Sequence, residues 1–250
     1  MLSGYSILIT GASEGLGRGM ALAAAAAGAG VVVSALDAAS AQSVSDEIIA
    51  RGGRAIGIAC DVTKRTDIAA AVAAATSAFG RLDCFVHNAN LTSPRARSIE
   101  DIGDGDWNPV VAVGLRTIFY ASQCVLPALV ESQGSMVIMT SQSGVDGTPH
   151  LPIYACVKGA QRGMTKSLAR EWGPLGVRVN ALAPSAVTPA LEGYLEREPW
   201  MRLHMIERSP LRRFGDAEAD IGRALNFLIG PESRFVTGQT LTVNGGAMML

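Results

Sequence analysis

Short apolar runs alternate with longer alanine-rich stretches along the chain. The runs have the length and the valine and isoleucine content of buried strands, and the longer stretches repeat apolar residues at helical spacing. This alternation predicts an α/β protein with a doubly wound parallel β-sheet and helices on both faces. We predict about seven strands, at Ile7–Thr10, Val31–Ala35, Ala55–Ala59, Cys84–His87, Met136–Ser141, Val177–Ala183 and Thr240–Val243. Helices are expected at Leu16–Ala27, Ala39–Arg51, Arg65–Phe79, Trp107–Glu131, Ile153–Trp172 and Ala217–Ile229.

The carboxyl ends of the predicted strands carry most of the polar turns. Right-handed crossovers bring these ends to one edge of the sheet, which is where open α/β sheets hold their sites. We therefore expect one crevice lined by Gly11, Asp61, Asn88, Ser141 and Pro184.

The first crossover begins with a glycine-rich turn, Thr10–Gly17. Glycines at 11, 15 and 17 allow a tight change from strand to helix. The helix N-terminus then presents backbone N–H groups and a positive dipole end, which suit a pyrophosphate. Because such turns also occur without a nucleotide, this motif gains weight only from the motifs that follow it.

A second motif follows the fifth predicted strand, where Ser141 precedes Tyr154 and Lys158. The tyrosine and the lysine stand four residues apart on a predicted helix, so they share one face. A nearby ammonium lowers the pKa of a phenol from about 10 toward neutral pH, and a serine hydroxyl would hold a substrate oxygen close by. The Tyr–Lys spacing by itself indicates a solvated surface pair more often than a site. The preceding serine and the glycine turn favour acid–base chemistry.

In their order and spacing, these motifs resemble those of the short-chain dehydrogenase/reductase family, and the resemblance covers essentially the whole chain. Further matches are Asp61-Val62, Asn88-Ala89, Phe235–Gln239 and Asn244–Gly246. The resemblance implies a single Rossmann-type domain over residues 1–250. It also implies a nicotinamide cofactor and hydride transfer between that cofactor and a secondary alcohol or ketone.

The resemblance also assigns roles to individual residues. It implies that Tyr154 exchanges the proton of the substrate oxygen, that Ser141 hydrogen-bonds this oxygen, and that Lys158 lowers the tyrosine pKa and holds the nicotinamide ribose. Asp61 is expected to contact the adenine edge rather than to cap the following helix. No metal is expected, because no cluster with ligand spacing is visible. The expected cofactor-binding residues are Gly11, Ser13, Gly15, Leu16, Gly17, Asp61, Val62, Asn88, Ala89, Val187 and Thr188.

The chain departs from the family pattern at three places. Asn90 replaces a usual glycine and would crowd a cofactor, and Gly114 replaces a usual asparagine, although its carbonyl and a helix bend would still serve a proton relay. The loop Pro184–Thr188 brings the threonine one residue early. In relatives a valine and a threonine here hold the nicotinamide carboxamide, which is why Val187 and Thr188 are the candidates. These departures leave open a second function, that of a dinucleotide-binding sensor or scaffold with weak turnover.

Cofactor choice depends on the end of the second strand. By resemblance, Ala35 and Leu36 stand where NAD-preferring members carry Asp and NADP-preferring members carry Arg. Two nearby carboxylates, Glu14 and Asp37, would repel a 2′-phosphate, which favours NAD(H) over NADP(H). Both residues are equally well explained as solvated residues at helix starts.

Residues 190–213 are expected to cover the substrate as a lid, or to pack on the domain as an amphipathic helix; the two are compatible. The apolar members are Leu191, Tyr194, Leu195, Trp200, Met201, Leu203, Met205 and Ile206, and the basic members are Arg197, Arg202, Arg208, Arg212 and Arg213. Candidate substrates are a 3-oxoacyl thioester, a steroid or other cyclic alcohol, and a sugar or polyol. The apolar residues make the sugar the least favoured.

The composition of the chain limits the kinds of partner that we expect it to bind. A chain of 250 residues suits one domain, and its net charge of −1 gives no electrostatic footprint for nucleic acid or an anionic membrane. Residues 19–36 are uncharged and of spanning length, but their alanine content favours a soluble interpretation. We expect a small-molecule substrate and, by resemblance, a homotetramer or dimer formed through the two longest predicted helices.

The cysteines indicate the compartment. Cys60, Cys84, Cys124 and Cys156 are widely spaced and form no C-x-x-C pair. They are expected to be free thiols in a reducing environment, which predicts a cytoplasmic protein.

Overall fold

Parallel strands form the centre of the molecule in a computed structural model that describes residues 1–91 and 96–249. Within these residues a seven-stranded sheet has the order β3-β2-β1-β4-β5-β6-β7, and every neighbouring pair is parallel. The strands are β1 (Ser6–Thr10), β2 (Gly30–Ala35), β3 (Arg54–Ala59), β4 (Cys84–His87), β5 (Ser135–Met139), β6 (Arg178–Pro184) and β7 (Thr240–Val243). The predicted doubly wound α/β sheet is confirmed, with strand ends shifted by at most two residues.

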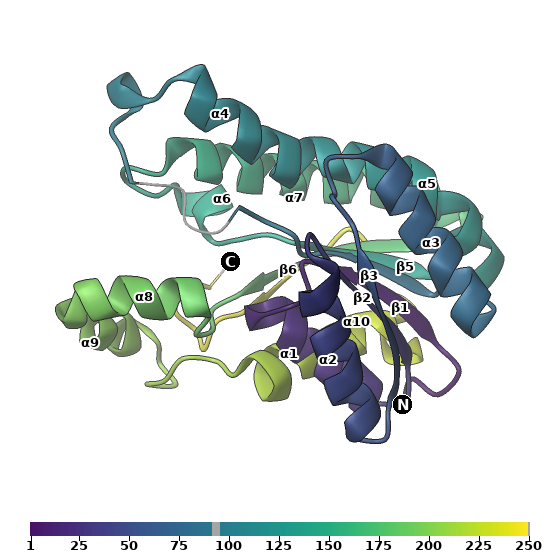
Figure 1. Ribbon diagram of the computed structural model, residues 1–250. Helices are drawn as coiled ribbons and strands as arrows, with labels where there is room; N and C mark the ends of the chain where they lie inside the picture. Colours follow the sequence, from purple (N-terminus) through teal and green to yellow (C-terminus); the bar gives the residue numbers. More distant parts are fainter. Residues whose placement is uncertain (92–95, 250) are drawn as a thin grey trace.

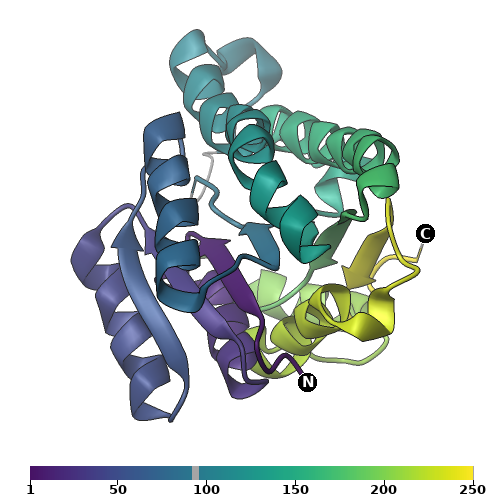
Figure 2. The same ribbon diagram turned by 90° about the vertical axis from the view of Figure 1, so that its right-hand side faces the viewer.

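Helices cover both faces of this sheet (Figures 1 and 2). One face carries α1 (Gly15–Ala26), α2 (Ala38–Ala50) and α10 (Arg223–Ile229), and the other carries α3 (Arg65–Phe79), α5 (Thr117–Ser132) and α7 (Pro152–Trp172). Two apolar cores result, one on each side of the sheet. β1, β2, β4 and β5 are buried over their whole length, because helices exclude water from both of their faces.

The helix predicted at Trp107–Glu131 is not continuous. It consists of α4 (Asp104–Val111), a π-helical turn η2 (Ala112–Arg116) and α5. The helix predicted at Ala217–Ile229 likewise begins with a π-helical segment, η4 (Ala217–Gly222), before α10. A π-turn widens the backbone over a few residues only, and such a short segment is not revealed by periodicity.

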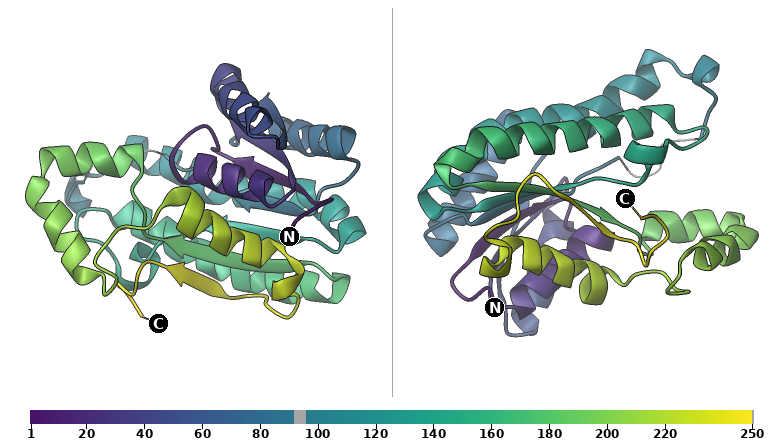
Figure 3. Two further views of the ribbon diagram at one scale, coloured as in Figure 1. Left: turned by 90° about the horizontal axis from the view of Figure 1, so that it is seen from below. Right: turned by 180° about the vertical axis from the view of Figure 1, so that it is seen from behind.

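Residues 190–213 fall mostly in two helices, α8 (Pro189–Arg197) and α9 (Pro199–Arg208), which extend from the body of the molecule (Figures 1 and 3). The remaining short elements are η1 (Ile99–Asp101), α6 (Ser143–Asp146), η3 (Gly173–Leu175) and η5 (Pro231–Ser233). Leu195 is buried, whereas Trp200 and Leu203 are exposed. The side chain of Tyr194 lies outside the described part of the structure.

The stretch Asp104–Ser132 is long and apolar enough to cross a membrane by length and composition. Ile118, Val125 and Leu129 from this stretch pack in the core beside α3 and α7. Because a core helix passes the same test, the stretch is weak evidence for a span.

Candidate active site

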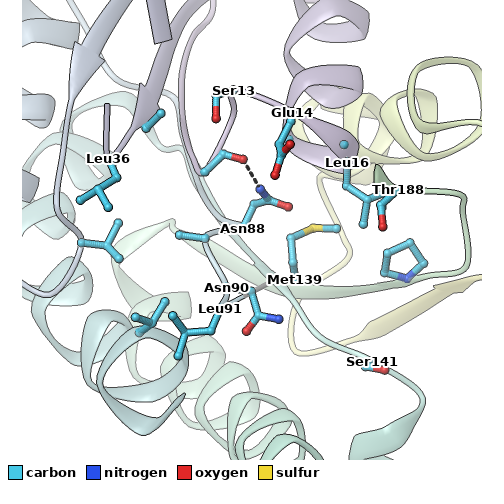
Figure 4. A pocket seen from close by; sticks show the side chains of 18 of the residues that line it. Ser13, Glu14, Leu16, Leu36, Asn88, Asn90, Leu91, Met139, Ser141 and Thr188 are labelled. Atoms are coloured by element: carbon cyan, nitrogen blue, oxygen red, sulfur yellow. Dashed lines mark hydrogen bonds between the residues drawn. The ribbon is translucent and has the colours of Figure 1, made fainter. Parts of the chain in front are cut away.

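A pocket of about 620 Å³ lies at the carboxyl ends of the central strands. It adjoins the point where the sheet order reverses between β1 and β4, which is the usual binding place in open α/β sheets. Figure 4 shows Ser13 and Leu36 at one end and Ser141 at the other. Each residue predicted for the site lines this pocket except Val187; these are Gly11, Ser13, Gly15, Leu16, Gly17, Asp61, Val62, Asn88, Ala89, Ser141, Tyr154, Lys158 and Thr188.

The glycine turn is held by Asn88. Its Nδ2 donates hydrogen bonds of 2.9 Å to the carbonyl oxygens of Thr10 and Gly11. Gly11 has a φ of +62°, and a Cβ at Gly17 would lie 2.6 Å from this Nδ2. The turn therefore excludes side chains and leaves its backbone open to the pocket, as a dinucleotide requires.

Thr10 is a residue that sequence reasoning missed. Its Oγ1 donates to the Val86 carbonyl oxygen at 3.2 Å and accepts from the backbone N–H groups of Asn88 and Ala89, both at 3.1 Å. One hydroxyl thus joins the end of β1 to the loop after β4. Its place at the end of a buried strand, directly before the glycine turn, was the available signal.

The two carboxylates considered for cofactor choice differ in their surroundings. Asp37 caps α2, where its side chain accepts a 2.7 Å hydrogen bond from the Ser40 N–H, and it does not line the pocket. That hydrogen bond holds the pKa of Asp37 below its usual range. Glu14 lines the pocket and forms no side-chain cap on α1. Repulsion of the 2′-phosphate of NADP(H) would therefore come from Glu14, because Asp37 caps a helix.

Asp61 is engaged by its own turn. It accepts hydrogen bonds from the Thr63 N–H at 3.0 Å and the Thr63 hydroxyl at 2.7 Å, and it pairs with Lys64 at 3.4 Å. The Thr63 hydroxyl is the main cause of its lowered pKa. Lys64, and not Asp61, is the N-cap residue of α3. The side chain of Asp61 instead orders the turn before this helix, and Asp61 lines the pocket.

Lys158 and Tyr154 come from the first turns of α7. The Lys158 side chain is buried, and its Nζ lies 5.5 Å from the centre of the Tyr154 ring. The Nζ donates a hydrogen bond of 2.8 Å to the Met139 carbonyl oxygen at the end of β5. The Thr140 hydroxyl donates a 2.9 Å hydrogen bond to the Lys158 carbonyl oxygen. These two bonds fix α7 against the strand that delivers Ser141.

The pKa of the Tyr154 phenol differs from the value that the sequence led us to expect. Burial raises the pKa of the Tyr154 phenol, and the Ser141 side chain acts in the opposite direction as a hydrogen-bond partner. Burial lowers the pKa of the Lys158 ammonium to about 7. The expected lowering of the tyrosine pKa by Lys158 is therefore wrong for this arrangement, because burial outweighs the attraction of a lysine that donates to a carbonyl instead.

The loop Pro184–Thr188 does not bring both of its candidates to the pocket. Thr188 lines it, but the Thr188 Oγ1 accepts the Leu191 N–H at 3.2 Å near the start of α8. Asn90 lies in the pocket wall. The η2 turn contains Gly114, whose carbonyl accepts a 2.8 Å hydrogen bond from Gln161 Nε2.

The described side chains of residues 190–213 do not line the pocket. Met139, Leu91, Val113 and Leu151 form its apolar wall instead, together with Pro189. In the described ranges, no group of three or more His, Cys, Asp or Glu residues is arranged to hold a metal ion.

Comparison with known proteins gives consistent matches over the full length. A family model for enoyl-(acyl carrier protein) reductase matches residues 11–248. The chain is 33% identical over 246 residues to a 3-oxoacyl-[acyl-carrier-protein] reductase of Staphylococcus epidermidis, covering 98% of this chain and 99% of that protein. It is 33% identical over 249 residues to a 7alpha-hydroxysteroid dehydrogenase of Escherichia coli, covering 99% and 95%. The crystal structure of a 3-ketoacyl-(acyl-carrier-protein) reductase from Brucella melitensis complexed with NADH aligns with a TM-score of 0.90 at 32% identity, covering 100% of both chains.

Proposed function

This chain belongs to the short-chain dehydrogenase/reductase family, as an oxidoreductase of alcohol and ketone groups with a nicotinamide cofactor, and we propose that Ser141, Tyr154 and Lys158 are its catalytic residues. The observation that supports this is their meeting in one pocket with the glycine turn. A sensor or scaffold role is not favoured, because these residues line one pocket together and the relatives are by name a reductase and a dehydrogenase.

Tyr154 is suited to give a proton to a substrate oxygen. Its raised pKa keeps the phenol protonated at neutral pH, which favours the ketone-reducing direction. The Ser141 hydroxyl donates to the same oxygen as negative charge develops on it. Lys158 supplies a positive charge at the base of the pocket and fixes the tyrosine ring. A bound nicotinamide supplies the hydride acceptor or donor.

The cofactor would lie along the glycine turn and the ends of β2, β3 and β4. The backbone at Gly11, Gly15 and Gly17 would hold the pyrophosphate, and Asp61, Val62 and Ala89 would line the nucleotide. We propose a preference for NAD(H), since Glu14 lines the pocket and the positions Ala35 and Leu36 offer no cation to a 2′-phosphate.

We propose a hydrophobic or acyl-type ketone or alcohol as the substrate. The wall of Leu91, Val113 and Leu151 is apolar, which suits an oxoacyl chain or a cyclic alcohol better than a sugar. Residues 190–213 are proposed to cover the substrate when it binds. In this arrangement α8 and α9 stand beside the pocket, linked to each other by the Arg202–Glu192 ion pair.

Assembly and compartment are also proposals. We propose a homotetramer or dimer, built through α5 and α7. Of the small residues on α7, Gly159 packs closely within the chain itself, since a Cβ there would lie 3.3 Å from the Gly144 carbonyl oxygen, whereas a Cβ at Gly163 would meet no described atom within 4 Å. Phe119 on α5 is 50% exposed. Residues 1–250 are proposed to form one domain, in the cytoplasm, where Cys60 and Cys84 stay reduced.

The test is binding followed by turnover. NAD(H) and NADP(H) are titrated separately by quenching of tryptophan fluorescence, and a panel of ketones and alcohols is then assayed with the cofactor that binds. We expect a turnover loss of roughly 10²–10⁴-fold in Tyr154→Phe with unchanged cofactor binding. Tyr120→Phe, the same change on α5 outside the pocket, is the control. Full turnover in Tyr154→Phe would contradict the assignment.

A further inference from the structure

His87 is a buried imidazole that the proposed chemistry does not use. It is the last residue of β4, is 1% exposed, and pairs in register with Ile138. The next residue along β5, Met139, is the one whose carbonyl accepts from Lys158. Neither ring nitrogen of His87 makes a hydrogen bond of good geometry in the described part of the chain, although the Gly114 backbone lies close enough to act on the ring.

The surroundings keep this imidazole neutral. Burial, with a smaller effect from the positive charge of Lys158, lowers the pKa of His87 to about 3, and the Gly114 backbone opposes the change. The charged side chains of elements that pack nearby include Arg116 of η2 and Arg162 of α7, and Nη1 of Arg162 is also buried without a partner among the described residues. A neutral imidazole carries one N–H donor and one acceptor nitrogen. His87 is therefore able to accept a hydrogen bond from an ammonium or from a water bound to it.

A second unpartnered polar atom lies in the same region. Gln161 Nε2 donates to the Gly114 carbonyl oxygen, while its Oε1 is buried and lacks a partner among the described residues. A side chain at position 114 is excluded, because its Cβ would lie 2.6 Å from Val157 Cγ1. Because η2 and α7 pack so closely, only the backbone of Gly114 fits between the His87 ring and the Gln161 side chain.

These orphan atoms call for a partner. A buried polar group without one costs about 1–3 kcal/mol, and buried water normally satisfies such groups. Lys158 has three N–H donors and uses one on Met139. We propose that His87 is a positioning residue for Lys158: with Gln161 it holds buried water that hydrogen-bonds the ammonium from the side away from Tyr154. The inference rests on the proposed role of Lys158.

The expected consequence is a shift in proton affinity. Removing the acceptor nitrogen withdraws a hydrogen bond from the charged form of Lys158, which disfavours the ammonium. The alkaline limb of the pH–rate profile, where the ammonium loses its proton, should then move to lower pH. We expect a shift of about one pH unit in His87→Leu and a smaller shift in His87→Asn, whose amide still offers an acceptor.

The first readout is independent of turnover. The chain has three histidines, and His150 and His204 are both exposed, so ¹⁵N-histidine NMR of the full chain contains its own reference signals. We expect His87 to stay neutral from pH 5 to 9, and its ring shifts to respond as Lys158 titrates. This response should disappear in Lys158→Met. A His87 that titrates like His150, or whose shifts follow pH equally in Lys158→Met, would overturn the proposal.

The second readout is the pH–rate profile of His87→Leu and His87→Asn. Asn226→Leu is the control, because it also removes a side chain with an unpartnered oxygen but lies on α10, on the opposite face of the sheet. Thermal melting and NADH binding identify variants that fold. Profiles of both folded His87 variants that match the wild type and Asn226→Leu would overturn the proposal. Full turnover in Lys158→Met would instead refute the proposed role of Lys158, while the NMR response still reports on the His87–Lys158 coupling.

Discussion

Lys158 donates a hydrogen bond of 2.8 Å from its Nζ to the Met139 carbonyl oxygen from a position that is only 4% exposed. The ammonium is thereby anchored to the end of a central strand, and no carboxylate of the described residues forms an ion pair with it. Burial without an ionic partner is the reason that its pKa falls to about 7.

This burial predicts a pH dependence of stability. The lysine pKa is lower in the folded protein, about 7, than the value of about 10.4 in the unfolded chain. Between these values the unfolded chain binds more protons, so the Lys158 contribution to stability rises with pH. In Lys158→Met, the stability gained relative to the wild type should be largest below pH 7 and should shrink by several kcal/mol toward pH 10. Denaturant unfolding across this range measures it, with Lys166→Met, an exposed lysine of the same helix, as the control. A pH-independent difference would contradict the lowered pKa.

Cofactor preference should depend on Glu14 and not on Asp37. Replacing the pocket-lining carboxylate by a cation, Glu14→Arg, should raise NADP(H) affinity relative to NAD(H) by about tenfold or more, equivalent to about 1.4 kcal/mol. Asp37→Asn should leave the ratio unchanged, because that side chain caps α2. Fluorescence titration with both cofactors measures the ratios. An equal change of the affinity ratio in Glu14→Arg and Asp37→Asn would contradict the prediction, because it would show that lining the pocket is not what decides cofactor preference.

The glycine turn should be intolerant of one methyl group. In Gly17→Ala, the new Cβ would lie 2.6 Å from Asn88 Nδ2 and still closer to the Gly11 carbonyl oxygen, so the turn must shift. We expect a loss of about 1–3 kcal/mol in stability and a weakening of NAD(H) binding by more than tenfold. Gly103→Ala, where a Cβ meets nothing within 4 Å, is the matched control. Wild-type affinity in Gly17→Ala would contradict the cradle described for the pyrophosphate.

Asp83 lies at the amino-terminal ends of the central strands, away from the pocket, and its replacement should affect stability and not catalysis. Asp83 is 3% exposed and accepts a 2.8 Å hydrogen bond from the Ser6 N–H, besides pairing with Arg81. Asp83→Ala leaves that N–H without its partner, so we expect a loss of about 1–3 kcal/mol. Arg81→Ala leaves the buried Asp83 carboxylate without its cation, so we expect a loss of at least similar size. Unfolding by denaturant measures both, and a loss of activity in folded Asp83→Ala would be unexpected.

The sheet and the pocket were predictable because they depend on local pattern. Buried strands show as apolar runs, and their carboxyl ends must meet, so the place of the crevice followed from strand order. The individual cofactor-binding residues followed from the resemblance to the family. The division of the Trp107–Glu131 helix did not follow, because a segment as short as η2 is not revealed by periodicity. The tyrosine pKa depends on burial in three dimensions, which spacing does not report. The hydrogen bonds by which Thr188 and Asp37 cap helices also could not be predicted. They depend on where α8 and α2 begin in the folded chain.

The single hydroxyl of Thr10 has a consequence for how such a protein diversifies. It ties the end of β1 to the loop after β4, so the turn that carries Gly11 and the loop that carries Asn88 keep a fixed spacing. α8 and α9 stand outside this connection, and of their described side chains only Pro189, the first residue of α8, lines the pocket. Changes in those two helices can therefore alter what approaches the pocket while the Thr10 connection stays intact.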